Sequence, residues 1–256
     1  MIIIKAKNEI DKMRRGGKIL GEIMDELART IVPGKNTFEI DELAEKLIRS
    51  RGGFPIFKGQ GEKNNPYPAT ICASINSEIV HGIPSVKKII QTGDLFKIDI
   101  GMRWENMITD MARTFEVGKV SFKAQKLKEV TKEALQLGIK KIKARIFLEE
   151  YSSAVEKYVK KNGFSIVRDL VGHGVGRKLH EDPQIPNFKN GLRGPRLLEG
   201  MTLALEPMIN AGTAKTKILK DGWTFVTDDG ELSAHFENTI LVKKNGVEIL
   251  TPTKLS

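Results

Sequence analysis

Four acidic residues interrupt sequence runs that are otherwise apolar, and together they suggest metal-binding chemistry. Asp99 lies in LFKIDIGM, Asp110 in ITDMARTFEV, Glu206 in MTLALEPMI and Glu237 in AHFENTILV. Asp is depleted in strands, and neighbouring buried carboxylates repel one another unless cations neutralise them. Two divalent ions would supply +4 against the −4 of the set. Taken singly, each residue is better explained as a turn residue, an exposed polar residue or the partner of a Lys or Arg, but the four together predict a two-metal site.

The segment GHGVGRKLHEDP adds two histidines, His173 and His180, seven residues apart among three glycines. A phosphate-binding loop is disfavoured, because a dinucleotide site needs GxGxxG opening a helix, whereas this segment is GxGxG with Pro183 soon after. The glycines also argue against a helix that would place both histidines on one face. His173 is therefore a candidate metal ligand, and the glycines on either side leave space for the backbone to bend and for a metal ion to approach. His235 taken alone is typical of a hydrogen-bonded structural histidine.

Composition limits the class of protein. The chain has 256 residues, 40% of them apolar and 29% charged, and a net charge of +10. The positive excess predicts acidic partners such as RNA or a ribosomal surface, or else only a Lys-rich solvated surface. The single cysteine, Cys72, excludes an internal disulfide and CxxC zinc sites and fits a reducing, cytoplasmic setting. No apolar run reaches the length of a signal sequence or a membrane span, so we expect no membrane association.

The spacing of apolar residues predicts helices separated by groups of strands. Helices are expected over residues 7–31, 37–51, 121–147 and 149–161, the second of them capped by Asn36-Thr37. Strands are expected in 69–76, 94–101, 108–117, 172–183, 201–209, 222–230 and 233–250, with 54–66 as a polar loop. Asp99 and Asp110 would then face each other across a hairpin closed by the connection RWENM.

This order of elements, two helices and strands followed by two helices and strands, predicts an α+β fold with two similar halves. EKLI at 45–48 and EKYV at 156–159 occupy matching places in the halves, which is a faint internal repeat. No linker-like segment divides the chain. We therefore expect residues 1–256 to form a single domain.

With these residues in place, nearly the whole chain resembles the type I methionine aminopeptidases of the M24 family, which have the pita-bread fold. The motifs that carry the resemblance are SINSEIVHGIP, KIDIGM with TDMARTF, VGHGVGRKLHEDP, MTLALEPM and SAHFENTILV, in that order and spacing. The short step of 26 positions from His180 to Glu206 leaves no room for the helical insert of the type II enzymes. The resemblance implies a pseudo-twofold pair of helix–helix–antiparallel-sheet halves, with helices covering a curved sheet.

The resemblance also implies a role for each site residue. Asp99 would chelate one ion, Asp110 and Glu237 would bridge two, and His173 with Glu206 would complete the second. The catalytic set would be His81, His180 and Glu206. His180 would contact the scissile carbonyl, and His81 would hydrogen-bond the peptide near the scissile amide. The methionine pocket would include Tyr67, Cys72 and Trp223, although Cys72 could equally be core packing and Trp223 could simply cap a sheet.

The implied reaction is removal of the N-terminal methionine from nascent Met-Xaa polypeptides, preferably before a small second residue. A hydroxide held between two metal ions would attack, and Glu206 would relay its proton to the leaving amine. One imidazole and four carboxylates suit Mn, Fe, Co or Zn, and the sequence does not select among them. We expect a monomer that makes, at most, transient contact with the ribosome.

Three positions depart from the family pattern. Leu179 stands where members usually have Phe, Asn238 where they commonly have His, and His235 where they usually have Gln. Leu179 would alter one wall of the methionine pocket. His235 lies on the strand face of Glu237, which makes it either a support for the ligands or an accessory ligand.

Two alternatives remain from the sequence. A proline-specific aminopeptidase of the same fold usually carries a large extra N-terminal domain, whereas about 98 residues precede Asp99 here. A catalytically inactive binding protein would use the basic stretches at 140–143 and 157–161, but the intact ligand set argues against it.

Overall fold

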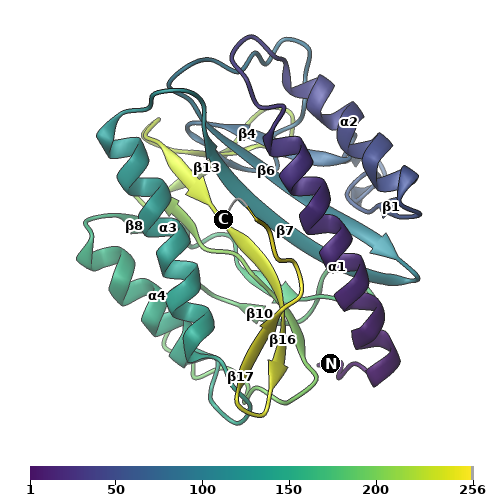
Figure 1. The fold of residues 1–256 in the computed structure, drawn as a ribbon. Coiled ribbons are helices and arrows are strands. Elements are labelled where there is room, and N and C mark those ends of the chain that lie inside the picture. Colours follow the sequence, from purple (N-terminus) through teal and green to yellow (C-terminus); the bar gives the residue numbers. More distant parts are fainter. Residues whose placement is uncertain (255–256) are drawn as a thin grey trace.

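The computed structural model describes residues 1–254 and is organised around a curled antiparallel sheet of nine strands (Figure 1). The strand order is β1-β6-β7-β16-β11-β9-β10, with β4 paired to β6 and β17 to β16. The strands of this sheet are β1 (Phe54–Pro55), β4 (Ile71–Ile75), β6 (Leu95–Trp104), β7 (Met107–Glu116), β9 (Gly172–Gly174), β10 (Glu181–Ile185), β11 (Thr202–Leu205), β16 (Glu237–Lys243) and β17 (Gly246–Ile249).

Three small sheets accompany the main one. They are β15-β12-β8, β13-β14-β5 and the pair β2-β3. Their bounds are β2 (Gly61–Glu62), β3 (Asn65–Pro66), β5 (Glu78–Val80), β8 (Ser165–Ile166), β12 (Met208–Asn210), β13 (Thr216–Ile218), β14 (Phe225–Thr227) and β15 (Ser233–His235). The polar loop predicted over 54–66 therefore contains three short strands, which polar residues alone did not indicate.

Four helices are present in the described residues, α1 (Lys7–Ala28), α2 (Thr37–Ser50), α3 (Phe122–Lys141) and α4 (Glu149–Lys161). The predicted cap of α2 is confirmed, because the Asn36 side chain accepts a hydrogen bond from the Glu39 amide. Two predicted ends were wrong: α1 stops at Ala28 and α3 at Lys141. None of these helices is long and apolar enough to cross a membrane.

The two helix pairs cover the same face of the sheet (Figure 1). Alternate residues of β6, Phe96, Ile98 and Ile100, pack in one apolar cluster with α1 and α2. Leu203 and Leu205 of β11 pack in a second cluster with α3 and α4. Because side chains alternate along a strand, the residues between these positions point to the opposite face. That uncovered face is the one that carries the acidic residues.

The predicted hairpin of β6 and β7 has a tighter turn than expected. Trp104 pairs with Met107, so only Glu105 and Asn106 connect the strands. Both residues have positive φ, 46° and 65°, as a type I′ turn requires. The ten-residue strands on either side form the longest ladder of the sheet and fix the relative position of Asp99 and Asp110.

Candidate metal and peptide site

Strand register alone places the acidic residues in a row across the sheet. Cys72 of β4 pairs with Asp99 of β6, Asp99 with Ala112 of β7, and Ala112 with Glu237 of β16. Directly paired residues in antiparallel strands share a face. The row therefore carries its carboxylates on one face, and the small Ala112 separates Asp99 from Glu237.

The other three predicted ligands join the same face by the two-residue period. Asp110 lies two residues before Ala112, His173 pairs with Ala204, and Glu206 lies two residues after Ala204. Glu206 follows Leu205, whose partner is Asn238, so it lies beside Glu237. Ligand atoms of Asp110, His173 and Glu237 all lie within 4.8 Å of one another. All five residues predicted to bind metal are thus brought together.

The four carboxylates are in an environment that resists their ionisation. Burial is the main cause of a raised pKa at Asp99, Glu206 and Glu237, with repulsion from the neighbouring carboxylates adding to it. Burial likewise raises the pKa of Asp110 to about 7. Within residues 1–254, no Lys or Arg side chain forms an ion pair with any of the four. Arg113 acts on Glu237 only at longer range, and buried carboxylates that form no ion pair indicate a site for cations.

Unsatisfied oxygens support the same conclusion. Oδ1 of Asp99 and Oε1 of Glu237 are buried and have no hydrogen-bond partner among the described residues. Buried acceptors normally have partners. A metal ion of the kind that carboxylate and imidazole ligands bind would satisfy these oxygens, so the residues present fit such a group.

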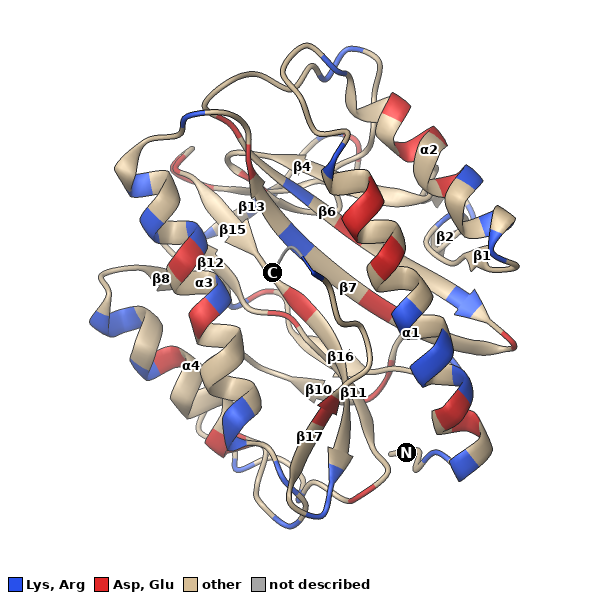
Figure 2. Cartoon of the chain, viewed as in Figure 1, with Lys and Arg blue, Asp and Glu red and all other residues tan. Residues whose placement is uncertain are grey.

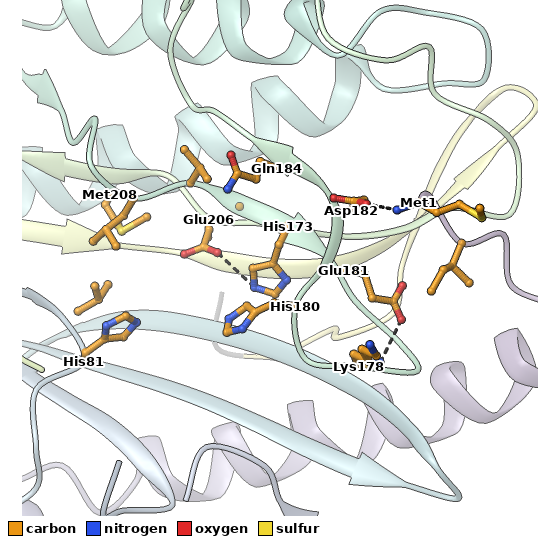
Figure 3. A pocket seen from close by; sticks show the side chains of 15 residues that line it. Met1, His81, His173, Lys178, His180, Glu181, Asp182, Gln184, Glu206 and Met208 are labelled. Atoms are coloured by element: carbon orange, nitrogen blue, oxygen red, sulfur yellow. Dashed lines mark hydrogen bonds and ion pairs between the residues drawn. The ribbon is translucent and has the colours of Figure 1, made fainter. Parts of the chain in front are cut away.

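His173 is oriented as a ligand by its own backbone. Its Nδ1 lies 2.9 Å from the Gly174 carbonyl oxygen, so Nδ1 carries the proton and Nε2 presents a lone pair. Nε2 lies 3.5 Å from Oε1 of Glu206 (Figure 3). Burial is the main cause that lowers the pKa of His173 to about 4, which keeps the ring neutral as metal binding requires.

The glycines of GHGVG allow the strands to approach closely. A Cβ on Gly172 would lie 2.5 Å from the Ala204 carbonyl oxygen, and one on Gly174 would lie 2.3 Å from that of Asp182. The predicted absence of a helix here is confirmed, because residues 172–174 form β9. The glycines thus have a backbone role in placing His173 between its neighbouring strands.

His180 and His81 stand beside the ligands. The rings of His173 and His180 are perpendicular, with centroids 4.5 Å apart (Figure 3). His81 has a positive φ of 57° and contacts the rings of Trp223 and Phe225 edge-on, at 6.2 and 5.8 Å. Burial lowers the pKa of His81 to about 4 and also lowers the pKa of His180. Both rings are therefore neutral near pH 7, with one N–H donor and one acceptor each.

A cavity of about 100 Å³ is bounded by the five predicted ligands on one side and by mainly apolar side chains on the other. Tyr67 and Trp223 pack edge to face with centroids 5.1 Å apart, and Cys72 and Leu179 are buried beside them. All residues that the sequence suggested for a methionine pocket line this cavity. Its lining consists of Phe57, Gln60, Tyr67, Cys72, His81, Asp99, Asp110, His173, Leu179, His180, Glu206, Trp223 and Glu237.

Phe57 and Gln60 are wall residues that the sequence did not single out. They belong to the segment before β2, which was predicted only as a polar loop. The signal that could have located Phe57 is Gly101, the partner of Asp110. A Cβ at Gly101 would lie 2.7 Å from Cε1 of Phe57, so the glycine makes room for this ring.

A second, wider cavity of about 490 Å³ adjoins the first and shares with it His81, His173, His180 and Glu206 (Figure 3). Its wall is mixed and includes Lys178, Asp182 and Gln184 beside apolar side chains. The arrangement is a small, mainly apolar cavity and a larger one of mixed polarity, which meet at the predicted ligands.

The departures from the family pattern fall in different places. Leu179 lines the small cavity, as expected. Asn238 lies next to Glu237 on β16, so its side chain points to the other face, where it accepts a hydrogen bond from Arg113 Nη2 at 2.7 Å. His235 is buried near Glu206, with its Nε2 3.7 Å from Oε2.

Comparison with known proteins agrees with this geometry. The sequence pattern of metallopeptidase family M24 matches residues 11–244. The chain is 48% identical to a methionine aminopeptidase of Clostridium perfringens, over 99% of this chain and 100% of that protein. It is 45% identical to methionine aminopeptidase 1 of Bacillus subtilis, over 98% and 99% of the two chains. The crystal structure of methionine aminopeptidase from Thermotoga maritima superposes with a TM-score of 0.94 at 42% identity, covering 98% of this chain and 99% of that one.

Proposed function

The chain belongs to metallopeptidase family M24, and from that premise we propose that it removes the N-terminal methionine of polypeptides with two divalent metal ions. The observation that carries the proposal is the row of buried carboxylates without ion-pair partners at the junction of the small apolar cavity and the wider one. Full-length similarity to methionine aminopeptidases supports the substrate.

Five residues would hold the ions: Asp99, Asp110, His173, Glu206 and Glu237. The ligand atoms of Asp110, His173 and Glu237 lie within 4.8 Å of one another, so these three side chains could hold one ion together. Two divalent ions would balance the four carboxylate charges. When bound, they would lower the pKa of a water molecule toward neutrality and polarise the scissile carbonyl.

The cavities would sort the substrate by size. The small one has room for a single side chain, and the walls formed by Phe57, Tyr67, Cys72, Leu179 and Trp223 suit the thioether of methionine, a soft apolar group. The polypeptide would continue into the wider cavity. The free α-amine of the substrate would bind one of the metal ions, which would make the enzyme an aminopeptidase.

The remaining polar groups would act on the peptide bond. His180 is exposed toward the cavity and neutral, so its N–H can donate to the carbonyl oxygen as negative charge develops there. His81, which also lines both cavities, can hydrogen-bond the peptide near the scissile amide. Glu206 has a raised pKa and borders both cavities, which suits it to accept a proton from water and deliver it to the leaving amine.

An activity assay tests this proposal. Metal-free protein should release methionine from a Met-Ala-Ser peptide only after Mn, Fe, Co or Zn is added. Asp110→Asn should lower kcat/KM by more than about 100-fold, since loss of partners outside the ligand shell already costs roughly 10–100-fold. Asp228→Asn, at an exposed carboxylate, is the matched control and should leave the rate unchanged. Hydrolysis of Xaa-Pro peptides in place of Met-Ala-Ser would show a proline-specific enzyme instead.

The positive charge of the chain supports one further partner. The net charge is +10, and Lys residues, most of them exposed, occur along α3 and α4 (Figure 2). Nascent chains emerge at a ribosome, whose RNA is acidic. Transient ribosome contact through this surface would bring the enzyme close to its substrates.

A further inference from the structure

His235 is a buried histidine without a hydrogen-bond partner. It ends β15, its side chain is 1% exposed, and neither ring nitrogen has a partner among residues 1–254. Leaving a buried polar group unpaired destabilises a fold, so a side chain of this kind calls for an explanation. The carboxylate of Glu206 lies close by, with its Oε2 3.7 Å from His235 Nε2.

The position of His235 excludes direct contact with substrate. Its side chain lines neither of the two cavities, whereas Glu206 borders both. His235 also lies outside the group of ligand atoms formed by Asp110, His173 and Glu237. The residue of the site that His235 contacts at short range is Glu206, so we consider its effect through that carboxylate.

The Glu206 carboxylate lies between two imidazoles. Oε1 lies 3.5 Å from His173 Nε2, and Oε2 lies 3.7 Å from His235 Nε2. His173 cannot donate to this carboxylate, because its proton is on Nδ1 and bonds to the Gly174 carbonyl. His235 is the imidazole whose Nε2–H is free to donate, and a shift of a few tenths of an ångström brings the pair to hydrogen-bond distance.

The backbone of Glu206 is fixed independently. Asn187 Nδ2 donates to the Glu206 carbonyl oxygen at 3.1 Å, and Tyr151 Oη in turn donates to Asn187 Oδ1 at 2.7 Å. These contacts leave the carboxylate free to rotate. A second anchor at the carboxylate is needed to fix its orientation.

We propose that His235 is a positioning residue, whose Nε2–H donates to Glu206 Oε2 and holds that carboxylate in the orientation that binds metal and moves the proton. The proposal rests on the assignment of Glu206 as a ligand in the proposed function. It explains why an unpaired imidazole is retained in the interior beside the site. Ligand-orienting hydrogen bonds of this kind are expected to change metal affinity by about 10- to 100-fold.

Two substitutions separate donation from packing. His235→Leu removes the donor and keeps an apolar side chain of moderate size, whereas His235→Gln restores an N–H donor of similar reach. Phe236→Leu is the matched control, because it alters a buried neighbour that packs in the opposite apolar cluster. Each variant is titrated with Mn²⁺ by calorimetry, its kcat and KM for a Met-Ala-Ser peptide are measured, and the melting temperature of its metal-free form is recorded.

We expect His235→Leu to weaken Mn²⁺ binding by about 10-fold or more and to lower kcat with little change in KM. His235→Gln should recover both within about threefold, and Phe236→Leu should leave the Mn²⁺ affinity unchanged. Equal Mn²⁺ affinities and kcat values in wild type and His235→Leu, with only a lower melting temperature, would overturn the proposal. If wild-type protein binds Mn²⁺ but releases no methionine, the proposed function fails, while the affinities still decide the role of His235.

Discussion

At the scale of single residues, the site stores electrostatic repulsion that a bound cation can relieve. Asp99, Asp110, Glu206 and Glu237 lie on one face of the sheet without a basic partner in the described residues. The nearby Arg113 instead donates through Nη1 to the backbone carbonyls of Ala112 and Glu237. Arg113 thus connects neighbouring strands through their backbone and forms no ion pair with the carboxylates, which remain available to bind cations.

This arrangement predicts opposite pH trends for the metal-free and metal-bound protein. The folded state raises the pKa of Asp110 from 3.8 to about 7 and raises the pKa of the other three carboxylates as well. The folded state then binds more protons than the unfolded state between about pH 4 and 7. Stability contributed by these groups is therefore lost as pH rises through that interval. Metal binding needs the deprotonated forms, so stabilisation by metal should grow over the same interval.

Melting temperatures measured in EDTA and in excess Mn²⁺ at pH 5, 6, 7 and 8 check this expectation. The difference between the two conditions should widen from pH 5 to pH 7, and Asp110→Asn should reduce it. A difference that stays constant across the series would contradict the assignment of these carboxylates as the metal ligands.

At the scale of elements, the sequence predicted those helices and strands whose formation depends on nearby residues. The helices 37–50 and 149–161 and the strands that carry Asp99 and Asp110 follow from apolar spacing and from capping residues. The C-terminal end of α3 at Lys141 could not be predicted in this way. Residues 142–147 continue a helical pattern, but Ala144 N bonds to the Lys243 carbonyl and Arg145 N to that of Leu197. Tertiary hydrogen bonds therefore override the local preference.

In the site, too, local sequence patterns predicted some features, whereas others depend on contacts between distant parts of the chain. Each ligand could be suspected from a charged residue in an apolar strand, and the family motifs supplied the roles. The pairing of Ala112 with Glu237, which joins the two halves of the row, connects residues far apart in the chain. No local pattern encodes such a register. Phe57 and Gln60 were missed for the same reason, since they reach the cavity only through the packing of their segment.

The turn of the β6–β7 hairpin gives a prediction at this scale. Glu105 and Asn106 both adopt left-handed backbone angles, which cost free energy for side chains other than glycine. Replacing the pair by Asn-Gly should stabilise the protein by about 1 kcal/mol and raise its melting temperature by roughly 2–4 °C. Glu105→Ala is the control, because it keeps the left-handed Cβ and should give no gain. A lower melting temperature in the Asn-Gly variant would show that the turn is not strained.

At the scale of the whole molecule, the two helix pairs cover one face of the sheet and leave the other to the site (Figure 1). EKLI and EKYV fall in α2 and α4, the second helix of each pair, as the faint repeat predicted. The chemistry is built where the halves join, since β7 of the first half pairs with β16 of the second. Ligands from both halves then meet only in the folded protein.

The charge of the whole molecule leads to the last prediction. Contact with ribosomal RNA through α3 and α4 would release counterions, so the affinity should fall steeply with salt. If about three phosphates are neutralised, binding should weaken roughly 20- to 40-fold between 50 and 200 mM salt. Sedimentation with purified ribosomes at both salt concentrations measures this change.

Charge reversal locates the contact. Lys157→Glu with Lys161→Glu on α4 should weaken ribosome binding at 50 mM salt and flatten its salt dependence. Lys7→Glu with Lys18→Glu on α1 changes the net charge equally on the other helix pair and serves as the control. Equal losses in both variants would show that only the overall charge attracts the ribosome. Absence of binding at 50 mM would remove this partner, because electrostatic contact is strongest at low salt.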